Sequence, residues 1–250
     1  MSDMFPDEQV RLTVAYDGGE FYGFQRQREE PTVQSCLEGV LERVNRGTVR
    51  IKGAGRTDSG VHAWGQIVCF RPRVNMPLRS WPEALNSRLP HSLVVREADR
   101  VSSAFDPVRD ARWKHYQYRV SVGRLMSPFE YRYSHWVHHG LDVGAMRRAA
   151  GRLLGRKDCA SFQVTGRPVH STVRTIYQVA ITEEGPGVKI DLVADGFLYK
   201  MGRRIAGTLI EVGRGAISLP DMDRIVDARE RSLAGPTAPA KGLCLMRVCY

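Results

Sequence analysis

A short glycine-rich stretch at residues 53–63 gathers side chains that could do chemistry. It holds one carboxylate, one guanidinium and one imidazole among three glycines, in the order Gly53-Ala54-Gly55-Arg56-Thr57-Asp58-Ser59-Gly60-Val61-His62-Ala63. Glycine lets the backbone adopt positive φ and approach a ligand closely. An arginine beside an aspartate can keep that carboxylate ionised and oriented. The stretch therefore predicts a site with Asp58 as its acid, although a glycine-rich turn with an Arg56–Asp58 surface pair fits the spacing as well.

Other clusters carry polar and aromatic side chains. The segment 17–27 mixes glycines, aromatics, amides and Arg26, which suits a grip on single-stranded nucleotides, or else a packed turn. Tyr116 and Tyr118 share a strand face with apolar residues, and the pattern allows either core tyrosines or a base-stacking site. Arg203 and Arg204 are expected on the helix face opposite Met201, where adjacent arginines are usually solvated.

Charge and composition indicate the class of partner. The chain has 250 residues and a net charge of +10, from 37 Lys+Arg against 27 Asp+Glu. Such an excess favours a polyanion, most often nucleic acid, although a merely basic surface would give the same number. The five cysteines are scattered without zinc-ligand spacing, so neither a structural metal nor a disulfide framework is predicted.

The compartment can be predicted from what the sequence lacks. Apolar runs stay well short of the roughly 18 residues typical of a membrane span. The first eight residues are acidic and contain no signal-peptide core. We therefore expect a cytoplasmic protein with no membrane partner.

Hydrophobic periodicity predicts the elements that position these clusters. In the first half we expect strands at 10–15, 49–51, 66–70 and 93–95, a helix capped by Thr32, and a short helix capped by Ser80. In the second half we expect strands at 112–122, 171–181, 188–193 and 243–250, and helices capped by Asp142 and Ser218 with a third at 198–212. The helix after Asp142 should bury its apolar stripe, which includes Leu153 and Leu154.

Both halves read β-α-β-β-α-β, the order of a ferredoxin-like module. The predicted class is α+β, with two ferredoxin-like (RRM-like) modules whose antiparallel sheets flank a central cleft. We place the boundary between residues 1–107, which carry the Asp58 loop, and residues 108–250. RNA-recognition modules use the open sheet of this architecture, but fold alone does not fix function.

In their order along the chain, these clusters resemble the TruA family of tRNA pseudouridine synthases. The resemblance covers nearly the whole chain and rests on Tyr16-Asp17-Gly18, Tyr22-Gly23-Phe24-Gln25, Thr32-Val33-Gln34, Gly55-Arg56-Thr57-Asp58-Ser59-Gly60-Val61-His62-Ala63, Gly65-Gln66, Asn86, Leu89-Pro90, Tyr116, Tyr118, Ser161-Phe162, Arg174-Thr175-Ile176, Arg203, Gly207, Glu211-Val212-Gly213, Lys241-Gly242-Leu243 and Tyr250. Departures are modest: Ser59 replaces the usual alanine, Phe24 a common tryptophan, and Arg109 is displaced by one position.

The resemblance implies a reaction and a set of site residues. The family isomerises uridine to pseudouridine without a cofactor or metal. Its motifs make Asp58 the essential carboxylate, Tyr116 the residue that stacks on the base, and Arg203 the partner of the aspartate. They place the substrate-binding residues at Gln25, Arg26, Arg56, Thr57 and His62. The family also implies a homodimer that acts on tRNA in the anticodon stem-loop, near positions 38–40.

Two other function classes compete with this one. A non-catalytic RNA-binding or RNA-folding protein could use the same cleft, but binding alone does not need an acid beside a phosphate-rich ligand. A metal-dependent nuclease would need a second carboxylate close to Asp58, which the sequence does not place there. Whether Asp58 acts as nucleophile, as base or by stabilising charge stays open.

Overall fold

The computed structural model describes residues 8–164 and 169–250. The chain is mixed α+β, with mostly antiparallel strands and, within the described residues, five α-helices. It divides into two compact units: residues 1–112 together with 245–250, and residues 113–244. We call them unit 1 and unit 2. The predicted absence of a leader concerns residues 1–7, which lie outside the described part.

Unit 1 is an antiparallel sheet with two helices. β1 (Glu8–Tyr16) lies between β4 (Leu93–Ser102) and β3 (His62–Phe70), while β2 (Lys52–Gly53) pairs with β3. The last strand of the chain, β10 (Leu243–Cys249), runs beside β3. Alternate residues of β1 are buried, as the period-2 pattern predicts: Val10, Leu12 and Val14.

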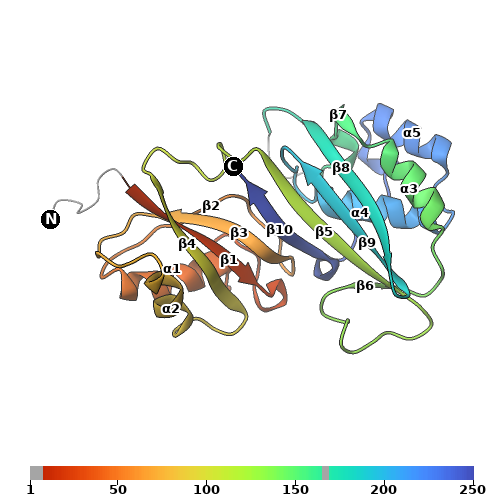
Figure 1. Cartoon of the computed structure of the whole chain (residues 1–250). Coiled ribbons are helices and arrows are strands. Elements are labelled where there is room, and N and C mark those ends of the chain that lie inside the picture. Colours follow the sequence, from red (N-terminus) through yellow and green to blue (C-terminus); the bar gives the residue numbers. More distant parts are fainter. Residues whose placement is uncertain (1–7, 165–168) are drawn as a thin grey trace. The chain divides into compact units, whose positions relative to one another are not determined.

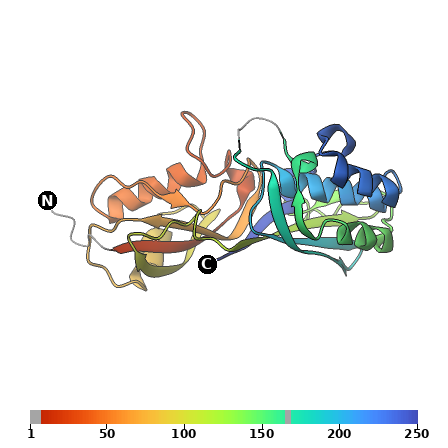
Figure 2. The same ribbon diagram turned by 90° about the horizontal axis from the view of Figure 1, so that it is seen from above.

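Helix α1 (Val33–Val44) lies along one face of this sheet, and α2 (Ser80–Asn86) contacts both α1 and β4 (Figures 1 and 2). α1 begins where predicted, because the Thr32 hydroxyl accepts the Ser35 backbone N–H at 3.1 Å. The Ser35 hydroxyl in turn accepts the Thr32 N–H at 3.1 Å, which completes a capping box.

Unit 2 has the strand order β5 (Trp113–Val122), β9 (Gly187–Ala194), β8 (Val173–Glu184) and β7 (Gly155–Asp158), all antiparallel neighbours. A short strand, β6 (His135–Val137), runs parallel to β5. Helix α3 (Val143–Gly151) contacts α4 (Met201–Gly213), α5 (Leu219–Ala228) and β8 (Figure 1). The predicted caps Asp142 and Ser218 are confirmed, each accepting the N3 amide of its helix.

Several local predictions are wrong. Residues 49–51 form no strand, and the short strand of this region, β2, begins at the next residue, Lys52. Ser80 is the first residue of α2 rather than its cap, and Arg79 at the cap position makes no side-chain hydrogen bond. Leu154 is 43% exposed because α3 ends at Gly151, so the helical stripe does not continue to it.

The described part of the chain contains no helix long and apolar enough to cross a membrane. All five cysteines are free thiols.

Candidate active site

The Asp58 loop connects β2 to β3 in unit 1. Its first residues are tied to β3 by a hydrogen bond from the Ala54 N–H to the Ile67 carbonyl at 2.8 Å. It then turns at Gly60, where φ is +78°, and the Val61 N–H donates to the Asp58 carbonyl at 3.1 Å. The backbone is thus fixed on both sides of Asp58, whose side chain is half-buried. A fixed, partly desolvated carboxylate is the element an acid-dependent reaction needs.

Thr57 anchors the loop to the sheet beneath it. The residue is buried, and its hydroxyl oxygen lies 2.8 Å from the Tyr16 hydroxyl oxygen. Next to it, the Gln66 amide donates to the Gly55 carbonyl at 2.9 Å. The Thr57 side chain therefore points into unit 1, while its carbonyl accepts the Phe24 N–H at 3.1 Å and joins the loop to segment 17–27.

His62 joins the same two segments from the other side. Its ring is buried, and Nδ1 accepts the Gly18 N–H at 3.0 Å. Asp17 Oδ1 lies 3.1 Å from the same nitrogen. His62 thus fixes the start of segment 17–27 against β3.

Two glycines allow this close approach. A Cβ on Gly18 would lie 2.0 Å from the Val61 carbonyl oxygen. Gly23 has φ of +86°, a conformation that L-residues rarely adopt, and faces the backbone of residues 57–59. Gly18 and Gly23 therefore serve backbone-to-backbone contact with the Asp58 loop.

Arg56 and Asp58 do not form the surface pair of the alternative interpretation. Arg56 is exposed, and over residues 8–164 and 169–250 it makes no hydrogen bond or ion pair. Its guanidinium is therefore available to a ligand. Asp58 does interact with other groups of the protein.

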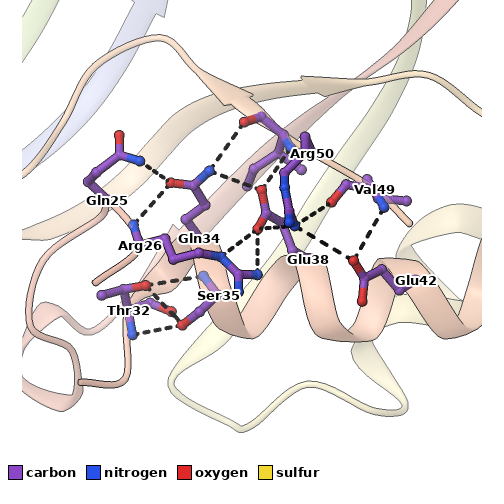
Figure 3. Close-up of polar contacts among 10 residues, drawn as sticks. Gln25, Arg26, Thr32, Gln34, Ser35, Glu38, Glu42, Val49 and Arg50 are labelled. Atoms are coloured by element: carbon purple, nitrogen blue, oxygen red, sulfur yellow. Dashed lines mark hydrogen bonds and ion pairs between the residues drawn. The ribbon is translucent and has the colours of Figure 1, made fainter. Parts of the chain in front are cut away.

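Gln25 and Arg26 are held by α1 (Figure 3). The Gln34 side-chain oxygen accepts from the Gln25 amide at 2.6 Å and from the Arg26 N–H at 3.0 Å. The buried Glu38 carboxylate accepts from the Arg26 guanidinium, with Nη2 at 2.6 Å and Nε at 2.9 Å. Arg26 keeps 44% of its side chain exposed, so it is both anchored and accessible.

The two tyrosines of unit 2 are buried on one face of β5, as the strand pattern predicts. Tyr116 is 8% exposed and packs edge-to-face against Phe197, with ring centroids 4.8 Å apart. Tyr118 is fully buried, and its hydroxyl donates to the Pro239 carbonyl at 2.9 Å. Burial raises the pKa of Tyr118 well above its usual range, so this phenol does not ionise near neutral pH.

The adjacent arginines of α4 differ in their environment. Arg203 is half-buried, and its Nε donates to the Ala238 carbonyl at 2.7 Å. Arg204, expected to be solvated, is only 6% exposed and donates to the Arg231 and Ala234 carbonyls at 2.7 and 3.2 Å. The expectation was wrong because these acceptors come from a distant segment that sequence periodicity does not locate. Tyr116 and Arg203 thus belong to unit 2, and the other predicted site residues belong to unit 1.

Gln34 and Glu38 were not predicted to support the site. A signal was present: Glu38 interrupts the apolar stripe of α1 between Leu37 and Leu41, where a charge is unexpected without a buried partner. Among the described residues, no group of three or more His, Cys, Asp or Glu side chains could hold a metal ion.

The chain is similar to known proteins over most of its length. A family model described as tRNA pseudouridine synthase matches residues 12–108 and 149–250. A tRNA pseudouridine synthase A of Halalkalibacterium halodurans is 44% identical over 237 residues, covering 94% of this chain and 90% of that protein. One of Moorella thermoacetica is 42% identical over 243 residues, covering 96% and 99%. A solved dye-decolorizing protein from V. cholerae, with a TM-score of 0.20 at 8% identity over 96% of this chain and 91% of that one, is too dissimilar to inform the fold.

Proposed function

Because this chain belongs to the tRNA pseudouridine synthase family, it is an isomerase that converts uridine in tRNA to pseudouridine, and we propose that Asp58 is its essential carboxylate. One observation carries the proposal. Asp58 is the only acid of the 53–63 stretch, and that loop is hydrogen-bonded on both sides of it.

The isomerisation sets the demands on the site. The bond between the uracil N1 and the sugar C1′ breaks, the base rotates, and its C5 bonds to the same sugar carbon, while C5 loses a proton and N1 gains one. Nothing is oxidised and no atom is added. A carboxylate can stabilise positive charge at the sugar, act as nucleophile, or remove a sugar proton. Each of these roles needs the Asp58 carboxylate held against the sugar, which a fixed loop provides.

The remaining residues act on the nucleotide or the tRNA backbone. We assign Arg56 and Arg26 to phosphate contacts, since both guanidiniums are accessible. Gln25 donates to the nucleotide from the same segment, and Thr57 and His62 hold the two site loops together. We assign Tyr116 to stacking on the uracil, and Arg203 is a further catalytic residue.

The substrate we propose is the anticodon stem-loop of tRNA at positions 38–40. A uridine in a helical arm must be extruded to reach an acid, at a cost of a few kcal/mol, which phosphate contacts of the basic chain offset. We further propose two ferredoxin-like modules, split near residues 107/108, and a cytoplasmic homodimer in which one tRNA contacts both subunits. A two-fold dimer doubles the basic surface available to a long ligand.

The test removes the acid, and of the two variants Asp58→Asn also keeps its shape. Asp58→Asn and Asp58→Ala should abolish pseudouridine formation and leave tRNA affinity within a few-fold. Turnover and binding are measured on one anticodon-arm transcript and on full-length tRNA. Substantial activity in Asp58→Ala would show that Asp58 is not the essential group, and tRNA binding without turnover in the wild-type protein would favour the RNA-binding alternative.

A further inference from the structure

Helix α1 contains a carboxylate with no exposed surface. Glu38 is 0% exposed and accepts hydrogen bonds from Arg26, from the Gln34 amide at 2.9 Å and from the Ile51 N–H at 3.1 Å. The Arg50 guanidinium lies 3.5 Å from the same carboxylate (Figure 3). Two oxygens thus collect donors from α1 and from two separate segments of unit 1.

Such a group is a poor source of stability. Desolvating a carboxylate costs several kcal/mol, and a buried ion pair often does no better than apolar residues of similar size. The neighbours Leu37 and Leu41 show that apolar side chains fit this part of the helix. The role of Glu38 is therefore sought in the positions that it gives to its hydrogen-bond donors rather than in stability.

One set of donors leads to the Asp58 loop through segment 23–27. Arg26 binds Glu38 directly, and Gln34 carries the contact to Gln25 and the Arg26 N–H. The Gln34 N–H also donates to the Phe24 carbonyl at 2.9 Å, and the Phe24 N–H donates to the Thr57 carbonyl at 3.1 Å. Thr57 immediately precedes Asp58.

Another donor, the Ile51 N–H, connects Glu38 to the opposite end of the Asp58 loop. Ile51 directly precedes β2, and its N–H is bound by Glu38 while its carbonyl lies 3.5 Å from the Gln34 amide. The backbone that enters the loop at β2 and the segment that contacts it at Thr57 are both fixed by one helical turn, Gln34 to Glu38.

We propose that Glu38 is a positioning residue for the isomerisation: through Arg26, Gln34 and Ile51 it sets the place of the Asp58 loop and of the Gln25–Arg26 segment. The proposal rests on the proposed function, since it assumes that Asp58 reacts. Glu38 itself does not touch the substrate.

The test compares two glutamates of α1 that are one helical turn apart. Glu38→Gln keeps the size of the side chain but replaces one of its two oxygens with an NH2 group. That group cannot accept hydrogen bonds from the donors bound there. Glu42→Gln is the matched control, because Glu42 has a 38% exposed side chain and lies 3.8 Å from Arg50 at the margin of the cluster. Single-turnover rates at saturating tRNA should fall about 10- to 100-fold in Glu38→Gln, as a displacement near 1 Å would cause. Affinity should change by less, and Glu42→Gln should match the wild type.

Amide hydrogen exchange separates positioning from a general loss of stability. Positioning predicts faster exchange in peptides covering 22–27 and 54–61, with β1 unchanged. A merely structural role predicts faster exchange throughout unit 1 and no rate loss at temperatures well below unfolding. If Glu38→Gln does not fold, Arg26→Gln removes the contact from a half-exposed position and should speed exchange in the same two peptides; unchanged exchange there would overturn the proposal.

Asp58→Asn, measured in the same assay, separates the two proposals. Full turnover in Asp58→Asn overturns the proposed function. If Asp58→Asn is inactive while Glu38→Gln turns over like Glu42→Gln, the positioning role alone is wrong.

Discussion

Replacing Gly18 with alanine tests how closely segment 17–27 and the Asp58 loop must approach. The added Cβ would lie 2.0 Å from the Val61 carbonyl oxygen and 2.4 Å from its carbon. Both are backbone atoms, so no side-chain rotation can relieve the clash. Ordinary contact begins at 3.4 Å, so the two segments must separate by about 1.4 Å.

That separation reaches the proposed acid directly. The Val61 N–H is bonded to the Asp58 carbonyl, and the Gly18 N–H is bonded to His62, so movement of either segment displaces the loop. Overpacking of this kind costs about 1–3 kcal/mol of stability. A displacement of about 1 Å at a reacting group can cost about 100-fold in rate. We therefore expect Gly18→Ala to lose stability and to lose single-turnover rate by a larger factor than stability alone explains.

Thermal unfolding and single-turnover kinetics on one tRNA transcript measure both effects. Gly39→Ala is the control, because Gly39 lies within α1 and a Cβ there meets nothing within 4 Å. That change should stabilise the protein by about 0.5–1 kcal/mol and leave the rate unchanged. If Gly18→Ala melts and reacts like Gly39→Ala, the close approach of the two segments is not needed and the reasoning fails.

Three further outcomes are expected. Tyr116→Phe should lower turnover more than binding and Tyr116→Ala should lower both, with about 1–3 kcal/mol of base stacking lost; equal activity of both variants with the wild type would make Tyr116 a core residue only. The Lys52 contact and the Val108 amide lower the pKa of Asp106 to about 2. The stability that the ionised Asp106 carboxylate contributes is therefore full above the unfolded pKa near 3.8 and is lost as pH falls toward 2. The stability difference between wild type and Asp106→Asn in denaturant titrations should therefore shrink from pH 5 to pH 2, and a constant difference would contradict this. Finally, a plot of the logarithm of tRNA affinity against the logarithm of salt concentration should fall with a slope of several units, at roughly 0.7–0.9 per phosphate contacted. A flat plot would mean that the +10 charge does not contact RNA.

Local signals in the sequence were sufficient where the stabilising contact is itself local. Thr32, Asp142 and Ser218 each cap the helix that follows within three residues, and all three caps were predicted. β7 was missed because its sequence, Gly-Arg-Lys-Asp, has no apolar alternation. It is a strand because it pairs with β8, from Gly155 opposite Ile176 to Asp158 opposite Val173.

The same distinction applies to the candidate site. Asp58 could be proposed as the acid from residue types and spacing, because acid, glycines and arginine are adjacent in sequence, and its role stays a prediction. The support of Arg26 by Glu38 joins residues 12 positions apart, and that of Thr57 by Tyr16 joins residues 41 positions apart. Contacts of that range depend on how α1 packs on the sheet, which periodicity predicts only as a buried face.

The discontinuity of unit 1 has a consequence for synthesis on the ribosome. Residues 245–250 cluster with residues 1–112, the Arg112 N–H donates to the Cys249 carbonyl at 2.8 Å, and the Tyr250 hydroxyl donates to the Pro107 carbonyl at 2.9 Å. These residues are translated only after the whole of unit 2. During elongation the edge of β3 that β10 will cover stays open, while the complete sequence of unit 2 emerges first. An open strand edge invites pairing with other chains, so the nascent first unit is the part of this protein that a chaperone would most need to shield.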